Sequence, residues 1–293
     1  MRDRLRPPPA PPGRPWRGEV ADPAMGTIRL SGVVDHVAGA DRIVVILHGL
    51  GGTAERSYCA WAASAARAAG LSSLRLNLRG ADGSGQDFYH IGLVDDLAAA
   101  LAHEEVARYP QRFALGFSLG GHIALRHVAQ AGEAAGLRAV AAVCPPIDLD
   151  ACATHIDTRR SWIYRQHLLT GLKEMYEKVA TARGEGAARR AEVRAIRTIR
   201  RWDDRVVAPR YGFADAADYY RQVGVGPHLA GIGVPSLVLA SAWDPMIPAR
   251  TVRPWLERAS RQVEVRWLDR AGHVGFPSDV AVMREVIEWM NEI

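Results

Sequence analysis

The feature that most constrains this 293-residue sequence is a serine between two glycines, in the run Gly116-Phe117-Ser118-Leu119-Gly120. An apolar segment ends at Gly116, and a run suited to a helix follows Gly120. A serine on so sharp a strand-to-helix turn has a strained backbone with crowded neighbours, so only glycine fits two positions before and after it. The pattern predicts a nucleophile elbow that exposes the Ser118 hydroxyl above a sheet edge. It also puts the Leu119 amide at a helix N-terminus, where it can face an oxyanion.

Apolar segments alternate with helix-like segments on both sides of this turn. The segment 42–47 is apolar on both faces, as strands of a covered parallel sheet are. The alternation predicts an α/β fold with a mostly parallel central sheet flanked by helices. The expected strands are 26–37, 42–47, 73–77, 112–116, 138–143, 235–240 and 263–268, and the expected helices are 57–69, 94–106, 119–131, 251–259 and 278–290.

Two segments interrupt the alternation. Residues from about 149 to 225 show only helical patterns rich in Arg, Ala, Tyr and Trp, which predicts a helical cap inserted between strands. Its apolar residues Trp162, Tyr164, Leu168 and Leu169 are expected either to line a pocket or to anchor the cap. Residues 1–22 are rich in Arg and Pro and predict a disordered tail, because proline runs block helix formation and strand pairing.

The composition argues against several classes of protein. The net charge of +5 is carried by arginine without a basic stripe interleaved with aromatic residues, which disfavours nucleic-acid binding and leaves a weak attraction to anionic membranes. No apolar run is long enough for a membrane-spanning helix, and the first residues lack the apolar core of a secretory signal, so we expect a cytoplasmic protein. Cys59, Cys144 and Cys152 lack the spacing of metal ligands or of a disulfide framework.

A nucleophilic serine needs a base within hydrogen-bond reach and a carboxylate that orients the base. Asp244 follows the expected strand at 235–240, and His273 follows the one at 263–268. Both lie where open parallel sheets place ligands, in the chain order Ser, Asp, His. The sequence therefore predicts a catalytic triad of Ser118, Asp244 and His273.

Other carboxylates compete for the orienting role. Asp148 also follows an expected strand, and Asp269 lies four residues before His273. We favour Asp244 because of its Asp-Pro-x-x-Pro turn, and we expect Asp269 to lie on the solvated face of the loop.

A second oxyanion donor is expected in the loop after the strand at 42–47. Gly49 and Gly51 let the Leu50 amide approach a substrate oxygen, and His48 is expected to fix this loop by hydrogen bonds. A plain glycine turn and a phosphate-binding loop are the alternatives. The loop lacks the spacing of a dinucleotide fingerprint and the Lys-Ser/Thr of a P-loop, so we expect neither a cofactor nor a metal.

Longer motifs carry a resemblance to a known family. They are Asn-x-Arg-Gly at 77–80, Tyr-His-Ile-Gly at 89–92, Asp-Asp at 203–204 with the residues that follow it, and Gly-His-Val-Gly-Phe at 272–276. From about residue 44 to 276 the chain resembles the YheT-like branch of the α/β-hydrolase superfamily. The resemblance implies an α/β-hydrolase domain over 23–293 that cleaves carboxylic esters, with acyl or lipid esters as substrates.

The residues also predict a mechanism. Ser118 attacks an ester carbonyl, His273 takes its proton and Asp244 holds the imidazole. The amides of Leu50 and Leu119 stabilise the oxyanion, and water then releases the acyl group. Two alternatives remain open: a catalytically silent binding protein, and an acyltransferase that uses the same residues. The expected partner is a small-molecule ester, and nothing in the sequence sets the oligomeric state.

Overall fold

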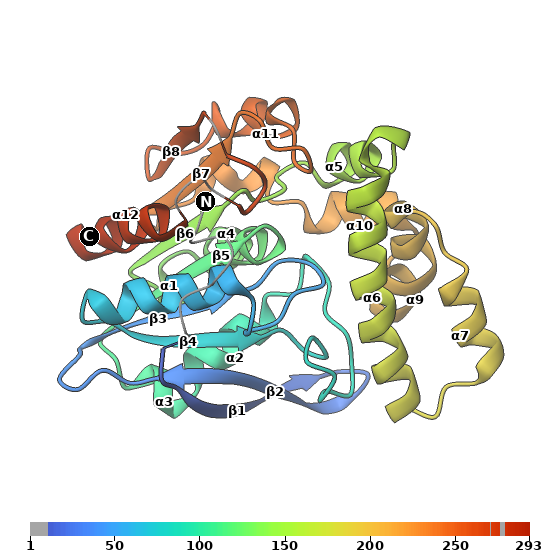
Figure 1. The fold of residues 1–293 in the computed structure, drawn as a ribbon, viewed down its shortest axis with the longest axis horizontal. Helices are drawn as coiled ribbons and strands as arrows, with labels where there is room; N and C mark the ends of the chain where they lie inside the picture. The colour runs from blue at the N-terminus through green and yellow to red at the C-terminus, as the bar shows by residue number, and fades with distance from the viewer. Residues whose placement is uncertain (1–10, 270, 276–278) are drawn as a thin grey trace.

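The computed structural model of the chain describes residues 11–269, 271–275 and 279–293. Its strands are β1 (Arg14–Asp22), β2 (Gly26–Asp35), β3 (Arg42–Leu47), β4 (Ser72–Asn77), β5 (Gln111–Phe117), β6 (Ala139–Val143), β7 (Ser236–Ser241) and β8 (Val263–Leu268). They form an eight-stranded sheet in the order β1-β2-β4-β3-β5-β6-β7-β8 (Figure 1). Strands β3 to β8 are parallel, and β2 pairs antiparallel with β1 and β4. The predicted mostly parallel α/β fold is confirmed.

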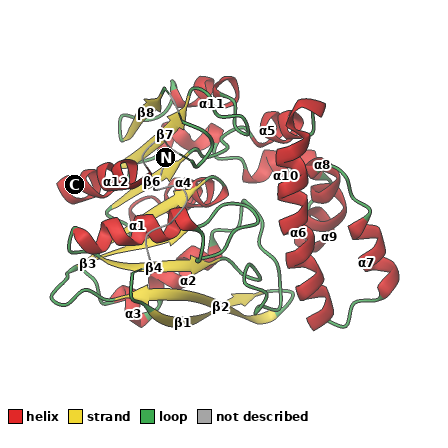
Figure 2. Cartoon of the chain, in the orientation of Figure 1, coloured by secondary structure: helices red, strands yellow, loops and turns green. Residues whose placement is uncertain are grey.

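The sheet is covered on both faces (Figure 2). The flanking helices are α1 (Ser57–Ala68), α2 (Asp95–Ala102), α3 (Glu104–Ala107), α4 (Leu119–Ala131), α11 (Ala249–Leu256) and α12 (Asp279–Glu292), with a 3-10 turn at Gly132–Ala135. In β3, Val44 and Ile46 join the apolar cluster beneath α1 and α12. Val45 and Leu47 join the cluster beneath α2 and α4 on the opposite face. This alternation explains why the strand is apolar at each position from 43 to 47.

Between β6 and β7 the chain forms helices and no strand. They are α5 (Leu149–Ile156), α6 (Trp162–Ala182), α7 (Ala187–Arg194), α8 (Ile199–Trp202), a π-helical turn (Asp203–Val207), α9 (Ala208–Tyr211) and α10 (Ala216–Val223), with 3-10 turns at Arg159–Ser161 and Gly226–Gly231. We call residues 149–223 the helical insertion; they coincide with the segment expected to be a cap. Helices α6 to α10 gather to one side, beyond the strand ends (Figure 1). Among the described residues, no helix combines the length and apolarity needed to cross a membrane.

The predicted disordered tail is wrong over residues 14–22, which form strand β1. Trp16 and Val20 point from β1 into the core, and their alternation with exposed residues fits a strand with one buried face. Pro15 is compatible with this position because β1 is an edge strand with a single neighbour. Residues 1–10 of the predicted tail lie outside the described residues.

The helix predicted at 94–106 is also wrong in part, because it breaks at His103. This residue is extended, with ψ of 136°, and its side chain accepts a hydrogen bond from the Glu105 amide. His103 therefore caps the N-terminus of α3, and its Nδ1 also accepts from the indole of Trp16 at 3.3 Å. His103 thus links the first strand to the helical layer.

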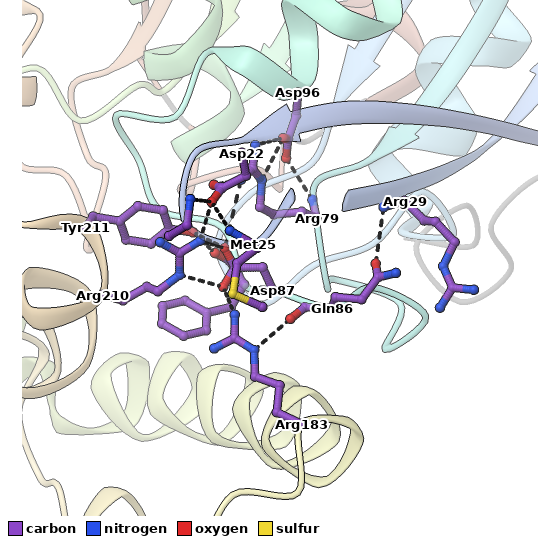
Figure 3. Close-up of polar contacts among 12 residues, drawn as sticks. Asp22, Met25, Arg29, Arg79, Gln86, Asp87, Asp96, Arg183, Arg210 and Tyr211 are labelled. Carbon is purple, nitrogen blue, oxygen red and sulfur yellow. Dashed lines mark hydrogen bonds and ion pairs between the residues drawn. The ribbon is translucent and has the colours of Figure 1, made fainter. Parts of the chain in front are cut away.

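A buried ionic network joins the sheet to the helical insertion (Figure 3). Arg79, just after β4, has only 1% of its side chain exposed. Its backbone amide and its Nε donate to the two carboxylate oxygens of Asp96, each at 2.8 Å. Its Nη1 donates to Asp22, at the end of β1, at 2.9 Å. Arg79 therefore gives partners to two largely buried carboxylates that would be costly to leave unpaired.

Asp87 extends the network to the helical insertion. Its fully buried carboxylate pairs with Arg183, just after α6, at 2.5 Å and with Arg210 of α9. Arg210 also pairs with Asp22 at 3.0 Å, and the Tyr211 hydroxyl donates to Asp87 at 3.2 Å. Arginines from two helices of the insertion thus converge on one loop of the sheet domain (Figure 3).

We expect Asp87→Asn to lower the free energy of unfolding by about 3–5 kcal/mol, because it removes the fully buried charge with which Arg183 and Arg210 pair. Chemical denaturation measures the change. The control is Glu192→Gln, which removes a surface carboxylate paired with Arg189. The Glu192 side chain is 69% exposed and the Arg189 side chain is 37% exposed. The control should change stability by at most about 1 kcal/mol. Equally small effects of both substitutions would contradict a stabilising network.

Candidate active site

Ser118 occupies the turn between β5 and α4 in a strained conformation, with φ of 51° and ψ of −116°. Its neighbours are crowded as the sequence predicts. A Cβ atom on Gly116 would lie 2.2 Å from the carbonyl oxygen of Gly120, and one on Gly120 would lie 2.6 Å from that of Leu47. No side chain fits at either glycine, so the chain turns sharply and presents the serine at the end of the sheet.

The structure brings Ser118, His273 and Asp244 together. The Nε2 atom of His273 lies 2.8 Å from the Ser118 hydroxyl, and its Nδ1 lies 2.7 Å from Asp244 Oδ2. The other carboxylate oxygen of Asp244 accepts hydrogen bonds from the amides of Met246 and Ile247, at 2.8 and 2.9 Å. With the Nδ1 proton donated to Asp244, Nε2 is free to accept the serine proton.

The competing carboxylates do not orient His273. Asp148 caps α5 by accepting from the Ala151 amide at 2.9 Å, and it faces the indole of Trp255 at 3.4 Å. Asp269 follows β8, but the imidazole bonds to Asp244 instead. The amides of Met246 and Ile247 hold the Asp244 carboxylate in a fixed orientation. This explains why Asp244 is the carboxylate that can bond to His273.

Cys144 is a residue of this site that sequence reasoning missed. It follows directly after β6 and has φ of 49°. Among the described non-glycine residues, only Ser118 also has a positive φ. The preceding carbonyl, of Val143, accepts from the Ser118 amide at 2.8 Å, so the two strained residues support one another. Burial raises the pKa of the Cys144 thiol well above its usual range, and its contact with the Asp244 carboxylate adds to the rise.

One ligand atom each from Cys144, Asp244 and His273 lies within 4.8 Å of the others, a spacing that a metal ion could use. The hydrogen bonds of His273 to Asp244 and Ser118 already engage both ring nitrogens. The cluster is therefore explained by hydrogen bonding, and we assign no metal to it.

His48 fixes the loop after β3, as the sequence predicts. Its Nδ1 donates to the Gly49 carbonyl at 2.8 Å, and its Nε2 accepts from the Leu78 amide at 3.2 Å. Burial lowers the pKa of His48 to about 4, so the ring is neutral at physiological pH and both nitrogens keep these roles.

Leu50 and Leu119 line the same pocket as Ser118 and His273. The loop of Leu50 is held on both sides: Gly49 donates to Tyr58 at 3.1 Å, and Gly51 donates to the Tyr89 hydroxyl at 2.7 Å. The structure thus places both residues in the pocket of the serine, while the oxyanion role of their amides stays a prediction.

The pocket extends from Ser118 beneath the helical insertion and encloses about 780 Å³ of empty space, part of it open to solvent. Its walls are mainly apolar, with Ile156, Leu168, Leu172 and Ile199 among them. Of the four apolar cap residues singled out from the sequence, Leu168 lines the pocket and Leu169 packs in the core. Trp162 and Tyr164 do neither, with 54% and 36% of their surface exposed.

Comparison with known proteins finds hydrolases, both by family and by individual relatives. The alpha/beta hydrolase family model matches residues 44–286. The chain is 32% identical over 239 residues to "Putative esterase YheT" of Escherichia coli strain K12, a match that covers 80% of this chain and 70% of that protein. It is 24% identical over 238 residues to human phospholipase ABHD3, a match that covers 80% of this chain but 58% of that protein.

A solved structure of the Pyrococcus furiosus esterase Pf2001 superimposes with a TM-score of 0.63 and 17% identity, covering 96% of this chain and 93% of that one. At this identity the likeness shows the fold alone.

The hydrogen bond from the Gly51 amide to the Tyr89 hydroxyl is expected to hold the loop of Leu50 in place. We expect Tyr89→Phe to slow the reaction of Ser118 with a fluorophosphonate probe by about tenfold to a hundredfold, because a loosened Leu50 loop misplaces a donor at the reacting centre. Gel fluorescence against time measures the rate.

The matched control is Tyr109→Phe, which removes a hydroxyl bonded to Ser72 at 2.9 Å, away from the pocket residues. It should label at the wild-type rate. Wild-type labelling of the Tyr89 variant would contradict a positioning role.

Proposed function

This chain belongs to the alpha/beta hydrolase family, and we propose that it hydrolyses carboxylic esters with Ser118 as its nucleophile. The observation that carries the proposal is the continuous hydrogen-bonded chain from Asp244 through His273 to Ser118, at 2.7 and 2.8 Å. Esterases and lipases recur among the names of its relatives. All three groups are in place, which favours an enzyme over a catalytically silent binding protein.

The mechanism follows from the geometry. Ser118 Oγ attacks the ester carbonyl while His273 Nε2 takes its proton, and buried Asp244 stabilises the imidazolium. The amides of Leu50 and Leu119 bind the oxyanion, and the loss of one such donor reduces turnover by roughly 10²–10³. The tetrahedral intermediate collapses as His273 protonates the leaving alcohol. Water, deprotonated by His273, then releases the acid from the acyl-enzyme.

The pocket supports apolar acyl or lipid-like esters as substrates. The pocket is lined by Ser118 and His273 and, beyond them, by apolar side chains of the helical insertion, an arrangement that suits an ester with an apolar tail. Its mainly apolar walls favour an alkyl or acyl chain over a charged group. The reaction draws on the chain's own residues alone, and we propose no cofactor.

We expect wild-type protein to hydrolyse members of a p-nitrophenyl ester series from acetate to palmitate, and Ser118→Ala to lose about 10⁴-fold or more of kcat, because it removes the attacking oxygen. Ser84→Ala, at an exposed serine bonded to Asp82, is the control and should keep full activity.

The outcomes of this assay separate the alternatives. Probe labelling of Ser118 without turnover of any member would overturn the ester-hydrolase proposal. Absence of both would favour a silent binding protein. Transfer of the acyl group to added alcohols or amines in preference to water would identify an acyltransferase.

We also propose a weak contact with lipid surfaces beside the pocket. Among the described residues, the exposed large apolar side chains are Trp162, Ile163, Tyr164 and Trp243. They come from two segments that His155 bridges, through the Pro245 carbonyl at 3.0 Å and the Ser161 hydroxyl at 3.3 Å. Exposed Arg159, Arg160 and Arg250 flank them and suit an anionic surface.

We expect Ser118→Ala protein to co-sediment with phosphatidylcholine vesicles more strongly when phosphatidylglycerol is added, and added salt to reverse the gain. Trp162→Ser combined with Trp243→Ser should lower the bound fraction several-fold, because interfacial burial of both indoles is lost. Glu192→Gln, remote from both segments, is the control. Unchanged sedimentation of the double variant would exclude this surface.

A further inference from the structure

The pocket contains an ionisable side chain that the proposed reaction does not use. Asp203 lines it together with Tyr219 and Tyr220, and all three come from the helical insertion. Asp203 is 8% exposed, so its carboxyl group lies inside the protein, in a cavity with mainly apolar walls. A carboxyl group in such a place is a functional-site candidate because burial without a partner costs free energy.

The carboxyl group is held in place yet keeps an unused acceptor. The Tyr220 hydroxyl donates to Asp203 Oδ2 at 2.5 Å. Within the described part of the chain, this is the only hydrogen bond to the Asp203 carboxyl group, which leaves Oδ1 available to a ligand. Tyr220 therefore fixes the orientation of the Asp203 carboxyl group but leaves its second oxygen without a hydrogen bond from the described residues.

Asp203 forms no ion pair within the described residues, and the charge of Arg200 offsets the cost of its burial only in part. The guanidinium of Arg200 pairs with Asp150 at 2.6 Å and lies 5.3 Å from the centre of the Tyr220 ring. Burial raises the pKa of Asp203 to about 7, although the hydrogen bond from Tyr220 opposes the rise. The group is thus partly protonated near neutral pH and does not form an ion pair that would explain it as a stabilising element.

The backbone around Asp203 is also unusual. Asp203 starts the π-helical turn, between α8 and α9. Wide turns of this kind are rare and occur frequently at functional sites, because they shift side chains relative to a regular helix. The turn gives an independent structural reason to look for a ligand at this position.

We propose that Asp203 accepts a hydrogen bond from a free hydroxyl group of the substrate, so that the pocket selects esters that carry a hydroxyl. The inference rests on the proposed function in that an ester occupies this pocket. An acceptor needs a donor on the ligand, and a hydroxyl can bond to either protonation state of the carboxyl group. A cationic ligand would pair only with the ionised form and would itself have to be desolvated among apolar walls.

The test measures binding rather than turnover. Ser118→Ala protein is titrated calorimetrically with ethyl octanoate and two hydroxylated relatives, ethylene glycol monooctanoate and ethyl ω-hydroxyoctanoate. One relative places the hydroxyl on the alcohol side of the ester, the other at the end of the acyl chain. We expect one of them to bind at least about tenfold more tightly than ethyl octanoate, the range for hydrogen bonds to such a group.

The variants locate the acceptor. The quantity compared is the dissociation constant of ethyl octanoate divided by that of the preferred hydroxylated ester. In the Ser118→Ala background, Asp203→Leu should bring this ratio to about one. Asp203→Asn keeps a carbonyl acceptor and should keep part of the preference. Asp204→Asn is the matched control. Its side chain accepts from the Ala216 amide at 2.7 Å and does not line the pocket, so the ratio should persist. Thermal unfolding checks that each variant is folded.

Three outcomes would overturn the inference. The first two are equal affinities for all three esters and a preference for a hydroxylated ester that survives Asp203→Leu. Tighter binding of octanoylcholine than of either hydroxylated ester, lost in Asp203→Asn, would overturn it in favour of a cation site. Because Ser118→Ala does not turn over, absence of esterase activity in the wild type leaves this test intact.

Discussion

The strained backbone at Ser118 is the constraint on which the rest of the site depends. Its φ of 51° is maintained because Gly116 packs on Gly120 and Gly120 packs on the end of β3. The Ser118 amide is in turn bonded to the last carbonyl of β6. The elbow therefore requires three neighbouring strands to end at one level, and a parallel sheet provides that. His273 and Asp244 follow β8 and β7 at the same edge, so the sheet that enforces the strain also brings these two side chains to Ser118.

The ionic network extends this constraint to the helical insertion. Asp87 pairs with Arg183 and Arg210 of the insertion, and two residues later Tyr89 accepts the Gly51 amide beside Leu50. One short loop thus contacts both the helical insertion and the loop of Leu50, and each of these contributes residues to the pocket. Charge neutralisation inside the network makes this arrangement tolerable in a buried environment, whereas an isolated charge there would be expelled or protonated.

The parts of the fold that could be predicted are those encoded by local patterns. The parallel strands are continuous apolar runs, the elbow is set by two glycines, and the acid and base follow strand ends in a fixed order. Strand β1 was not predicted because its apolar residues, Trp16 and Val20, lie in an Arg- and Pro-rich context. The strand forms by pairing with β2, and this pairing cannot be read from the segment itself. Cys144 carries no local signal, and Asp203 stands out in the sequence only as part of the Asp-Asp motif, without a role in the site. Their positions depend on contacts with Asp244 and Tyr220, which only the folded chain creates.

The proposed chemistry and the proposed selectivity of the site depend on different parts of the chain. Ser118, His273 and Asp244 follow strands of the sheet, whose parallel neighbours fix their positions closely. The pocket walls come largely from the insertion, where a π-helical turn places Asp203. Substitutions in the insertion can therefore change which ligand fits while the hydrogen bonds of the reacting groups stay intact. A buried carboxyl group with one tyrosine donor destabilises the folded chain by itself, and a ligand that donates to its free oxygen offsets that cost only when bound. Such a residue stabilises the complex with a ligand that carries a donor and does not stabilise a complex with a ligand that lacks one. This difference is the basis of the proposed selectivity.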